Sequence, residues 1–198
     1  AEMKAEYDRR GVRLFVFHDD NFFLPYLPKN IERYEKMAAL VRDEGMTDIG
    51  LVIKCRPNDV DPHLFRVLQE MGFPPDWCII DHSTEETTKT ILEAGFFCGH
   101  TVYPRTKLSA ERFANLVDEF GPERMMVNSS ADWGASDPLS VPKVVLELRR
   151  RGHSDAVIER IVWGNPVELF GKSGRLVLPG ATPSARPERS PRPEAVSP

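Results

Sequence analysis

Four short polar runs hold the side chains of this chain that are best suited to chemistry, and each follows an apolar stretch. They lie at 18–21 (His-Asp-Asp-Asn), 54–59, 81–82 (Asp-His) and 128–133. Imidazole and carboxylate groups are suitable ligands for zinc or manganese, and a carboxylate next to a metal-bound water can act as a general base. These residue types are therefore suited to metal-assisted hydrolysis, provided that the fold brings them together.

The segments around these runs alternate between apolar and amphipathic stretches. Apolar stretches predict strands at 14–17, 49–53, 77–80, 96–103 and 124–128. Helices are predicted to begin at Asn30, Asp61, Ser83 (with Glu86 in a capping box), Ser109, Pro142, Ser154 and Asn165. Such alternation predicts an α/β fold with parallel strands, either a partial (βα) barrel or an open parallel sheet with flanking helices. The C-terminal ends of parallel strands share one edge, where the polar runs would meet.

Residues 74–176 carry a series of motifs in a fixed order. The motifs are IDHSTEE at 80–86, GFF at 95–97, GHTVYP at 99–104, PERMMVN at 122–128 leading to Asp132, and WGNP with LFG between 163 and 171. Together they resemble the C-terminal half of a TatD-like metal-dependent hydrolase, one of the amidohydrolase-like barrels. The resemblance implies that His82 and Asp132 bind a metal and that Asp132 is the catalytic base. It also implies hydrolysis of a phosphodiester, ester or amide by metal-activated water.

The same resemblance predicts a weak metal site. The family pattern opens with a His-x-His pair on the first strand and adds a carboxylate further on, and this sequence has neither. His100 could fill the place of the family's second late histidine. With only His82 and Asp132 as ligands, we expect weak zinc or manganese binding, because catalytic zinc sites take about three ligands from the protein. The alternative is that His82 is a hydrogen-bonded strand-end residue and that Asp132 caps a turn.

Residues 11–72 resemble a different family. The runs FVFHDDNF at 15–22 and LVIKCRPN at 51–58 are similar to the middle of a cobalamin-associated radical SAM enzyme. This resemblance implies that Asp20 and Arg56 contact a polar cofactor, whereas the alternative is a salt bridge at the strand ends. The family's three-cysteine motif is absent from the sequence, so we expect no iron–sulfur cluster.

Composition narrows the class of protein further. The net charge of −4 does not indicate a nucleic-acid-binding surface, and no apolar run approaches the ~20 residues of a membrane span. Three cysteines without close spacing favour reduced thiols, and together with the absence of a signal-peptide pattern they predict a cytoplasmic protein. The pattern at residues 2–7 is that of a helix end, so we expect a natural segment to precede Ala1.

These interpretations divide the chain into a radical-SAM-like fragment at 1–73, a TatD-like half at 74–178 and a tail at 179–198. The tail is rich in Pro, Arg and Ser and is predicted to be disordered. We interpret the chain as an incomplete or fused TatD-like hydrolase acting on a small-molecule or phosphodiester substrate, with a fusion or an assembly artefact joining the parts near 72–77. The alternatives are a cofactor-binding fragment and a non-catalytic remnant. Unpaired edges of a half barrel predict self-association.

Overall fold

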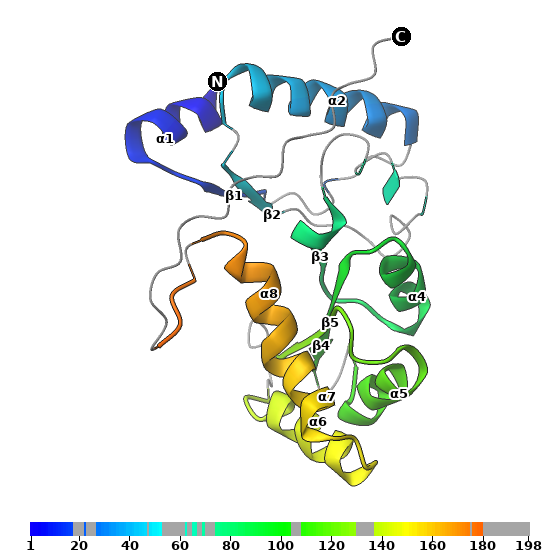
Figure 1. The fold of residues 1–198 in the computed structure, drawn as a ribbon. Helices are drawn as coiled ribbons and strands as arrows, with labels where there is room; N and C mark the ends of the chain where they lie inside the picture. The colour runs from blue at the N-terminus through cyan, green and yellow to red at the C-terminus, as the bar shows by residue number, and fades with distance from the viewer. Residues whose placement is uncertain are drawn as a thin grey trace.

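Two parallel sheets flanked by helices form the structure, which is a computed structural model (Figure 1). It describes residues 1–17, 22, 27–46, 48–52, 62, 65–66, 69, 74–103, 108–129, 137–174 and 176–179. One sheet has the order β1-β2 and the other the order β3-β4-β5. The predicted α/β class with parallel strands and flanking helices is confirmed, and the arrangement is consistent with a partial barrel. The predicted tail lies, apart from Pro179, outside the described residues.

The strands are β1 Leu14–Val16, β2 Gly50–Val52, β3 Ile79–Ile80, β4 Phe97–Val102 and β5 Met125–Ser129. The α-helices are α1 Glu2–Arg10, α2 Leu27–Asp43, α4 Glu85–Glu93, α5 Ala110–Phe120, α6 Ser140–Arg150, α7 Asp155–Glu159 and α8 Asn165–Gly171. The 3-10 helix η2 is Pro75–Trp77, and the π-helical segment η3, Arg160–Gly164, joins α7 to α8. The helix predicted to begin at Asp61 falls largely outside the described residues. None of the described helices combines the length and apolar character that a membrane crossing requires.

Several local predictions were wrong in detail. Helix α2 begins at Leu27 and contains the predicted cap Asn30, and α6 begins at Ser140 and not at Pro142. Trp77 belongs to η2, not to a strand, because the adjacent prolines set a tight turn before β3. Helix α4 is capped by Thr84, which forms a capping box with Thr87. The predicted capping box was Ser83 with Glu86. Ser83 lies one position before the cap, where its hydroxyl donates to the Ile80 carbonyl at 2.9 Å and its amide donates to the Gly99 carbonyl at 2.9 Å.

The first sheet is tied to α1 by polar contacts. The Tyr7 hydroxyl donates to Asp48 Oδ1 at 2.7 Å, and Arg13 Nε donates to Asp48 Oδ2 at 3.0 Å. The Arg13 guanidinium also lies 3.6 Å from the centre of the Tyr7 ring. These donors hold the pKa of the Asp48 carboxyl below its usual value, with the Tyr7 hydrogen bond as the largest cause. The start of the chain is thereby fixed to the β1–β2 layer.

The second sheet has β4 at its centre, and all six of its residues are buried. Cys98 and His100 face the helices: Cys98 packs in an apolar cluster with Ile91 of α4, and the His100 ring meets Phe113 of α5 edge-on at 5.2 Å. The largest apolar cluster lies on this helical side and joins β4 and β5 to α5, α6, α7 and η3. This packing holds the three strands in place, and the strands in turn position the side chains on the opposite face of the sheet.

The opposite face of the second sheet is divided along the strands. Near their N-terminal ends, Phe97 and Met126 pack against Leu169 of α8. Asn165 Nδ2 fixes α8 there by donating to the carbonyls of Pro122 at 2.8 Å and Met125 at 2.7 Å. The C-terminal ends of the same strands carry polar side chains on this face, and these form the candidate site.

Candidate functional site

Four polar side chains gather at the C-terminal ends of β3, β4 and β5, and we call them the strand-end cluster: Asp81, His82, Thr101 and Asn128. Asn128 Nδ2 donates to Asp81 Oδ1 at 3.0 Å, and His82 Nδ1 lies 2.6 Å from Thr101 Oγ1. His82 Nδ1 is also 3.9 Å from Asp81 Oδ2. Thr101 and Asn128 are register partners on adjacent parallel strands, so the sheet itself sets their spacing.

Gly99 makes the space that the Asp81 carboxylate occupies. A Cβ atom at this position would lie 2.6 Å from Asp81 Oδ1, 3.0 Å from Ile79 Cδ1 and 3.2 Å from Asp81 Cα. The distance to Asp81 Oδ1 is one that real Cβ atoms essentially never show, so the carboxylate would have to shift, and the other two distances are tighter than most real Cβ contacts. A glycine is therefore required if the carboxylate is to lie over the centre strand.

The backbone of His82 is in the left-handed region, with a φ of 60°. A non-glycine residue held there costs about 1–3 kcal/mol and often marks a functional site. The side chains of His82 and Asp81 are 56% and 44% exposed, so both can be reached by a ligand. Arg124 has a similar φ of 61°, but it lies before β5 at the opposite end of the strands, where it donates to the Gly95 carbonyl. Of these two strained residues, only His82 lies in the strand-end cluster.

His100 does not join the cluster. Its Nε2 lies 2.9 Å from Thr88 Oγ1 and its Nδ1 lies 3.3 Å from the Met126 carbonyl, on the helical side of the sheet. Burial lowers the pKa of His100 to about 4, so the ring is neutral at physiological pH. The suggestion that His100 supplies a second late histidine to the site is therefore incompatible with the direction of its side chain.

The cluster contains donors of the right kind for a metal but too few for a complete site. Carboxylate and imidazole suit zinc or manganese. In the part of the chain that the structure describes, no group of three or more His, Cys, Asp or Glu residues could hold a metal ion. The remaining predicted site residues, Asp132, Asp20 and Arg56, lie outside the described residues. Burial raises the pKa of Cys78 and of Cys98 to about 11, which makes both thiols poor ligands and nucleophiles.

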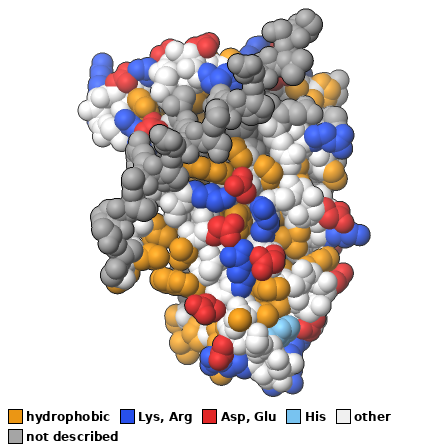
Figure 2. Space-filling model, in the orientation of Figure 1, with side chains coloured by type: hydrophobic (Ala, Val, Ile, Leu, Met, Phe, Trp, Pro, Cys, Tyr) orange, Lys and Arg blue, Asp and Glu red, His pale blue; other side chains and the backbone are white. Residues whose placement is uncertain are grey.

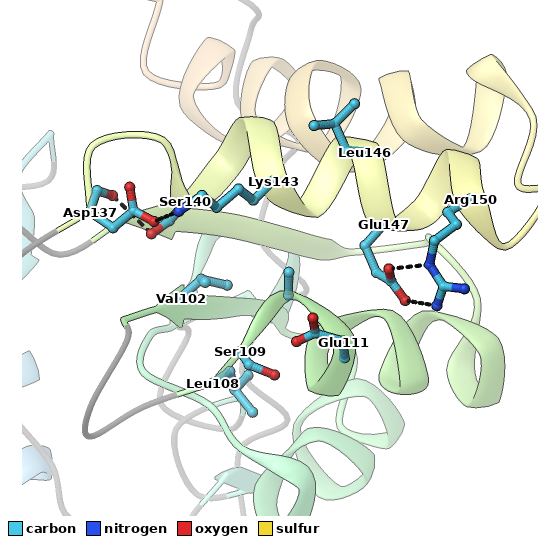
Figure 3. A pocket seen from close by; sticks show the side chains of 11 residues that line it. Val102, Leu108, Ser109, Glu111, Asp137, Ser140, Lys143, Leu146, Glu147 and Arg150 are labelled. Atoms are coloured by element: carbon cyan, nitrogen blue, oxygen red, sulfur yellow. Dashed lines mark hydrogen bonds and ion pairs between the residues drawn. The ribbon is translucent and has the colours of Figure 1, made fainter.

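A hollow away from the strand-end cluster lies between α5 and α6, with a volume of about 400 Å³ (Figure 3). Four of its charged side chains form two pairs: Lys143 Nζ lies 2.5 Å from Asp137 Oδ2, and Glu147 accepts two hydrogen bonds of 2.7 Å from Arg150. Arg150 is the largest cause that lowers the pKa of Glu147 to about 2. The ion pairs in this hollow neutralise each other's charges, whereas the His82 and Asp81 side chains of the strand-end cluster are exposed to a ligand.

Charged side chains are mixed over the visible face of the molecule. Figure 2 shows Lys and Arg interspersed with Asp and Glu, with apolar side chains between them. A nucleic-acid-binding surface would carry a clustered excess of Lys and Arg. This face gives no sign of such an excess, in line with the net charge of −4.

Sequence reasoning missed Thr101. It placed the runs at 81–82 and 128–133 at one edge of the sheet but did not identify the contact between Asp81 and Asn128. The signal for Thr101 was available, because side chains alternate along a strand and residues 99 and 101 must share a face opposite to 98 and 100. The contact of Asp81 with Asn128 had no local signal, since 47 positions separate the two residues. Their contact follows from the parallel pairing of β3, β4 and β5.

Comparisons with solved structures support the fold. An organophosphorus hydrolase variant from Deinococcus radiodurans is 18% identical, with a TM-score of 0.52 over 80% of this chain and 54% of its own. An enzyme engineered for organophosphate hydrolysis from a weak promiscuous lactonase is 17% identical, with a TM-score of 0.55 over 86% of this chain and 62% of its own. A variant PTE-like lactonase from Deinococcus radiodurans is 18% identical, with a TM-score of 0.53 over 86% of this chain and 63% of its own.

This likeness concerns the fold alone, because the identities are low, and the chain spans about 54–63% of the length of these structures. No protein-family model and no curated protein matches the chain. The predicted α/β class, a partial (βα) barrel or an open parallel sheet, is consistent with this likeness. By their descriptions, however, the three are organophosphate hydrolases and lactonases and not TatD-type hydrolases or radical SAM enzymes.

Proposed function

We propose that this chain is part of a metal-dependent hydrolase that uses its strand-end cluster to cleave a phosphoester, ester or lactone with water. The observation that carries the proposal is the pair Asp81 and His82, held exposed at the C-terminal end of a parallel sheet. Active sites of (βα) barrels lie at this end of the strands. The descriptions of the matched structures, organophosphate hydrolase and lactonase, support the same reaction class.

In this proposal, His82 and Asp132 are the metal ligands, and Asp132 also accepts a proton from the attacking water. A bound zinc or manganese ion would act as a Lewis acid that lowers the pKa of a water and polarises the scissile group. Asn128 orients the Asp81 carboxylate, and the exposed side of the cluster admits the substrate. With two protein ligands, the affinity for metal is low unless another segment or molecule adds a third.

Calorimetric titration of the full chain with zinc and with manganese tests the metal role. We expect weak binding by the wild type and at least tenfold weaker binding by His82→Ala and by Asp132→Ala. The matched control is His153→Ala, which removes an imidazole that contacts Asp118 at 2.8 Å, far along the chain from the cluster. Equal binding by all four proteins would rule out the metal role.

Hydrolysis is measured on the same proteins with a nitrophenyl phosphodiester, an organophosphate triester and a lactone. We expect slow turnover that depends on added metal and is lost in His82→Ala. Binding without turnover on any of these substrates would contradict the hydrolase and leave a metal-binding protein.

A non-catalytic protein is the second candidate function. It is favoured by one observation, the lack of a third His, Cys, Asp or Glu ligand within the described residues. The two candidates differ in turnover, because a non-catalytic protein hydrolyses none of the three substrates whether or not it binds zinc.

A further inference from the structure

The outer edge of β5 carries main-chain groups that point away from the sheet. Cys98 N donates to the Arg124 carbonyl at 2.8 Å, and in this parallel ladder residues 124, 126 and 128 direct their main-chain groups toward β4. Val127 and Ser129 alternate with them and therefore direct their N–H and C=O groups outward. Among the described residues, none hydrogen-bonds to the main chain of Val127 or Ser129 on this side. This part of β5 can therefore pair with a further strand.

The N-terminal part of the same edge is already covered. Asn165 Nδ2 donates to the outward carbonyl of Met125 at 2.7 Å, in the place where a neighbouring strand would donate. On either side of Asn165, Ile161 packs on the helical side of the sheet and Leu169 on the opposite side, so the chain passes around the edge at this level. A strand that adds to β5 is thus confined to its C-terminal part, next to the strand-end cluster.

The outer edge of β1 is open in the same way. Phe17 N donates to the Val52 carbonyl at 2.9 Å, so the odd-numbered residues of this strand direct their main-chain groups toward β2. Leu14 and Val16 direct theirs outward, and within the described part of the chain no residue hydrogen-bonds to them there. Both β1 and β5 are therefore edge strands with main-chain groups available for pairing.

The faces of the two strands show that these edges are complementary. Phe17 meets Phe22 edge-on at 5.1 Å, and Phe22 lies 5.6 Å from Tyr34 of α2, so the odd-numbered residues of β1 face their helix. The even-numbered residues, which carry the outward groups, lie on the open face and are about half exposed. On β5 the outward groups belong to Val127, which packs against the cluster on the helical side. One edge thus presents groups of helix-facing residues, and the other presents groups of open-face residues.

Parallel pairing of these two edges keeps the helices on one face. In a parallel ladder, a residue hydrogen-bonds to the two residues that flank its register partner. Val127 would therefore bind Leu14 and Val16 of a second copy, with Phe15 of that copy as its register partner. Val127 and Phe15 both face the helical side, so the pairing places the helices of both copies on the same face, and a shift by one residue would reverse this.

We propose that the C-terminal part of the β5 edge is a docking site for β1 of a second copy, so that two chains close one parallel barrel. The fold is consistent with a partial barrel, and the five strands of the described residues are too few to close one alone. The chain spans 54–63% of the structures that it matches, so two copies supply the length of a whole one.

The proposed dimer has a twofold axis along the strands. Such an axis forms the same junction twice and leaves no outer edge open. It encloses the exposed apolar side chains of Leu14, Val16 and Val52 and brings the strand-end clusters of both copies to the same end of the barrel. The inference does not rest on the proposed function, because it concerns the pairing of strands and not the chemistry at their ends.

Cysteine crosslinking tests the register of the junction. Asn128 becomes the register partner of Val16 of the second copy, with Cα atoms about 5 Å apart. We expect a mixture of Val16→Cys and Asn128→Cys proteins to form a covalent dimer on mild oxidation, and neither variant to do so alone. Val52→Cys is the matched control, because it places a cysteine of similar exposure on β2, one strand away from the junction, and should crosslink to Asn128→Cys at least tenfold less. Oxidised wild type gives the background from the three native cysteines.

Light scattering after size-exclusion chromatography tests the closed dimer. We expect the wild type to have the mass of two chains, with no larger species as the concentration rises. Val127→Pro removes an N–H that points away from β4 and leaves the ladder with β4 in place, so it should raise the dissociation constant of the dimer at least tenfold. Val177→Pro introduces the same residue at an exposed position outside the strands and should leave the mass unchanged.

Several results would overturn the inference even if Val127→Pro does not fold. A wild type that stays monomeric at high concentration shows that the edges do not pair, and masses that grow beyond two chains show an open assembly. A covalent dimer of Val16→Cys alone shows that two β1–β2 sheets pack face to face. Equal crosslinking of Val52→Cys and Val16→Cys to Asn128→Cys contradicts the proposed register.

Discussion

Gly99 has no side chain, and the space that this leaves is filled by the carboxylate of Asp81. The residue belongs to the buried centre strand, and Ile79 Cδ1 and the Asp81 backbone would also lie close to an added Cβ, so a shift of the Asp81 carboxylate alone does not relieve the crowding. At the level of single residues, the cluster thus depends on the lack of a Cβ atom at Gly99 as well as on its own polar groups. The strained backbone of His82 adds a second local constraint.

Replacement of Gly99 by alanine should therefore damage both stability and the cluster. We expect the free energy of unfolding to fall by about 1–3 kcal/mol, the usual cost of overpacking, and metal binding to weaken because Asp81 is displaced. Urea denaturation followed by zinc titration measures both. Gly171→Ala is the control, because nothing lies within 4 Å of its added Cβ; equal stability of the two variants would contradict the space requirement.

Because His100 is buried, we expect the stability of the protein to depend on pH. Burial lowers its pKa in the folded state to about 4, below the value of 6.5 for an exposed histidine, so the unfolded chain takes up a proton first as the pH falls. We expect the free energy of unfolding to decrease from pH 6.5 toward pH 4, by up to about 3 kcal/mol at 1.36 kcal/mol per pKa unit.

Urea denaturation at a series of pH values measures this dependence. The window from pH 6.5 to 4.5 separates His100 from Glu147, whose pKa of about 2 in the folded state affects stability only below its ordinary value of 4.5. In His100→Gln the slope within that window should flatten, whatever the stability of the variant. An unchanged slope would assign the dependence to other groups.

Among the elements, helix α6 buries one face in the core and exposes the other to solvent. Val144 and Leu148 are completely buried in the largest apolar cluster, whereas Leu146 on the same helix is 64% exposed. The apolar side packs on α5 and β5, and Glu147 lies between Arg150 and Arg151 at the helix end. The sheet is therefore supported by helices that pack on the face opposite the strand-end cluster.

Two leucines of α6 allow a matched test of this packing. Leu148→Ala should lower the free energy of unfolding by about 2–5 kcal/mol, because it leaves a cavity in the core. Leu146→Ala makes the same chemical change on the exposed face and should stay within about 0.5 kcal/mol of the wild type. Thermal and urea denaturation measure the loss of unfolding free energy in each variant. Similar losses in the two variants would contradict the assignment of the buried and exposed faces.

On the scale of the whole molecule, the β1–β2 sheet presents an apolar face. Leu14, Val16 and Val52 are 59%, 49% and 45% exposed, and they alternate with half-buried residues along the two strands. Exposed apolar strands and open sheet edges promote pairing between chains. This face gives the predicted self-association a defined location.

We expect the purified chain to form dimers or larger species at high concentration. Val16→Lys should shift the distribution toward the monomer, because it places a charge on the exposed face of β1. Val177→Lys introduces the same charge at a 70% exposed position outside the strands and serves as the control. Size-exclusion chromatography with light scattering gives the masses; a monomeric wild type would contradict the expectation.

The sequence by itself determined the α/β class, the parallel strands and the helix starts at Ser109, Ser154 and Asn165. Ser109 and Ser154 cap their helices as predicted, with hydroxyls that accept from the amides three positions later. These features depend on residues within a few positions of one another, so local patterns suffice to predict them. The polar run at Asp81 and His82 was placed correctly at a strand end by the same kind of reasoning.

Only the tertiary structure decided the composition of the strand-end cluster. The contact of His82 with Thr101 spans 19 positions and that of Asp81 with Asn128 spans 47. Both depend on the register of three parallel strands, which is set by packing of the whole sheet against its helices. The register also turned His100 toward the helices, because successive side chains of a strand point to opposite faces and a change of one position reverses them all.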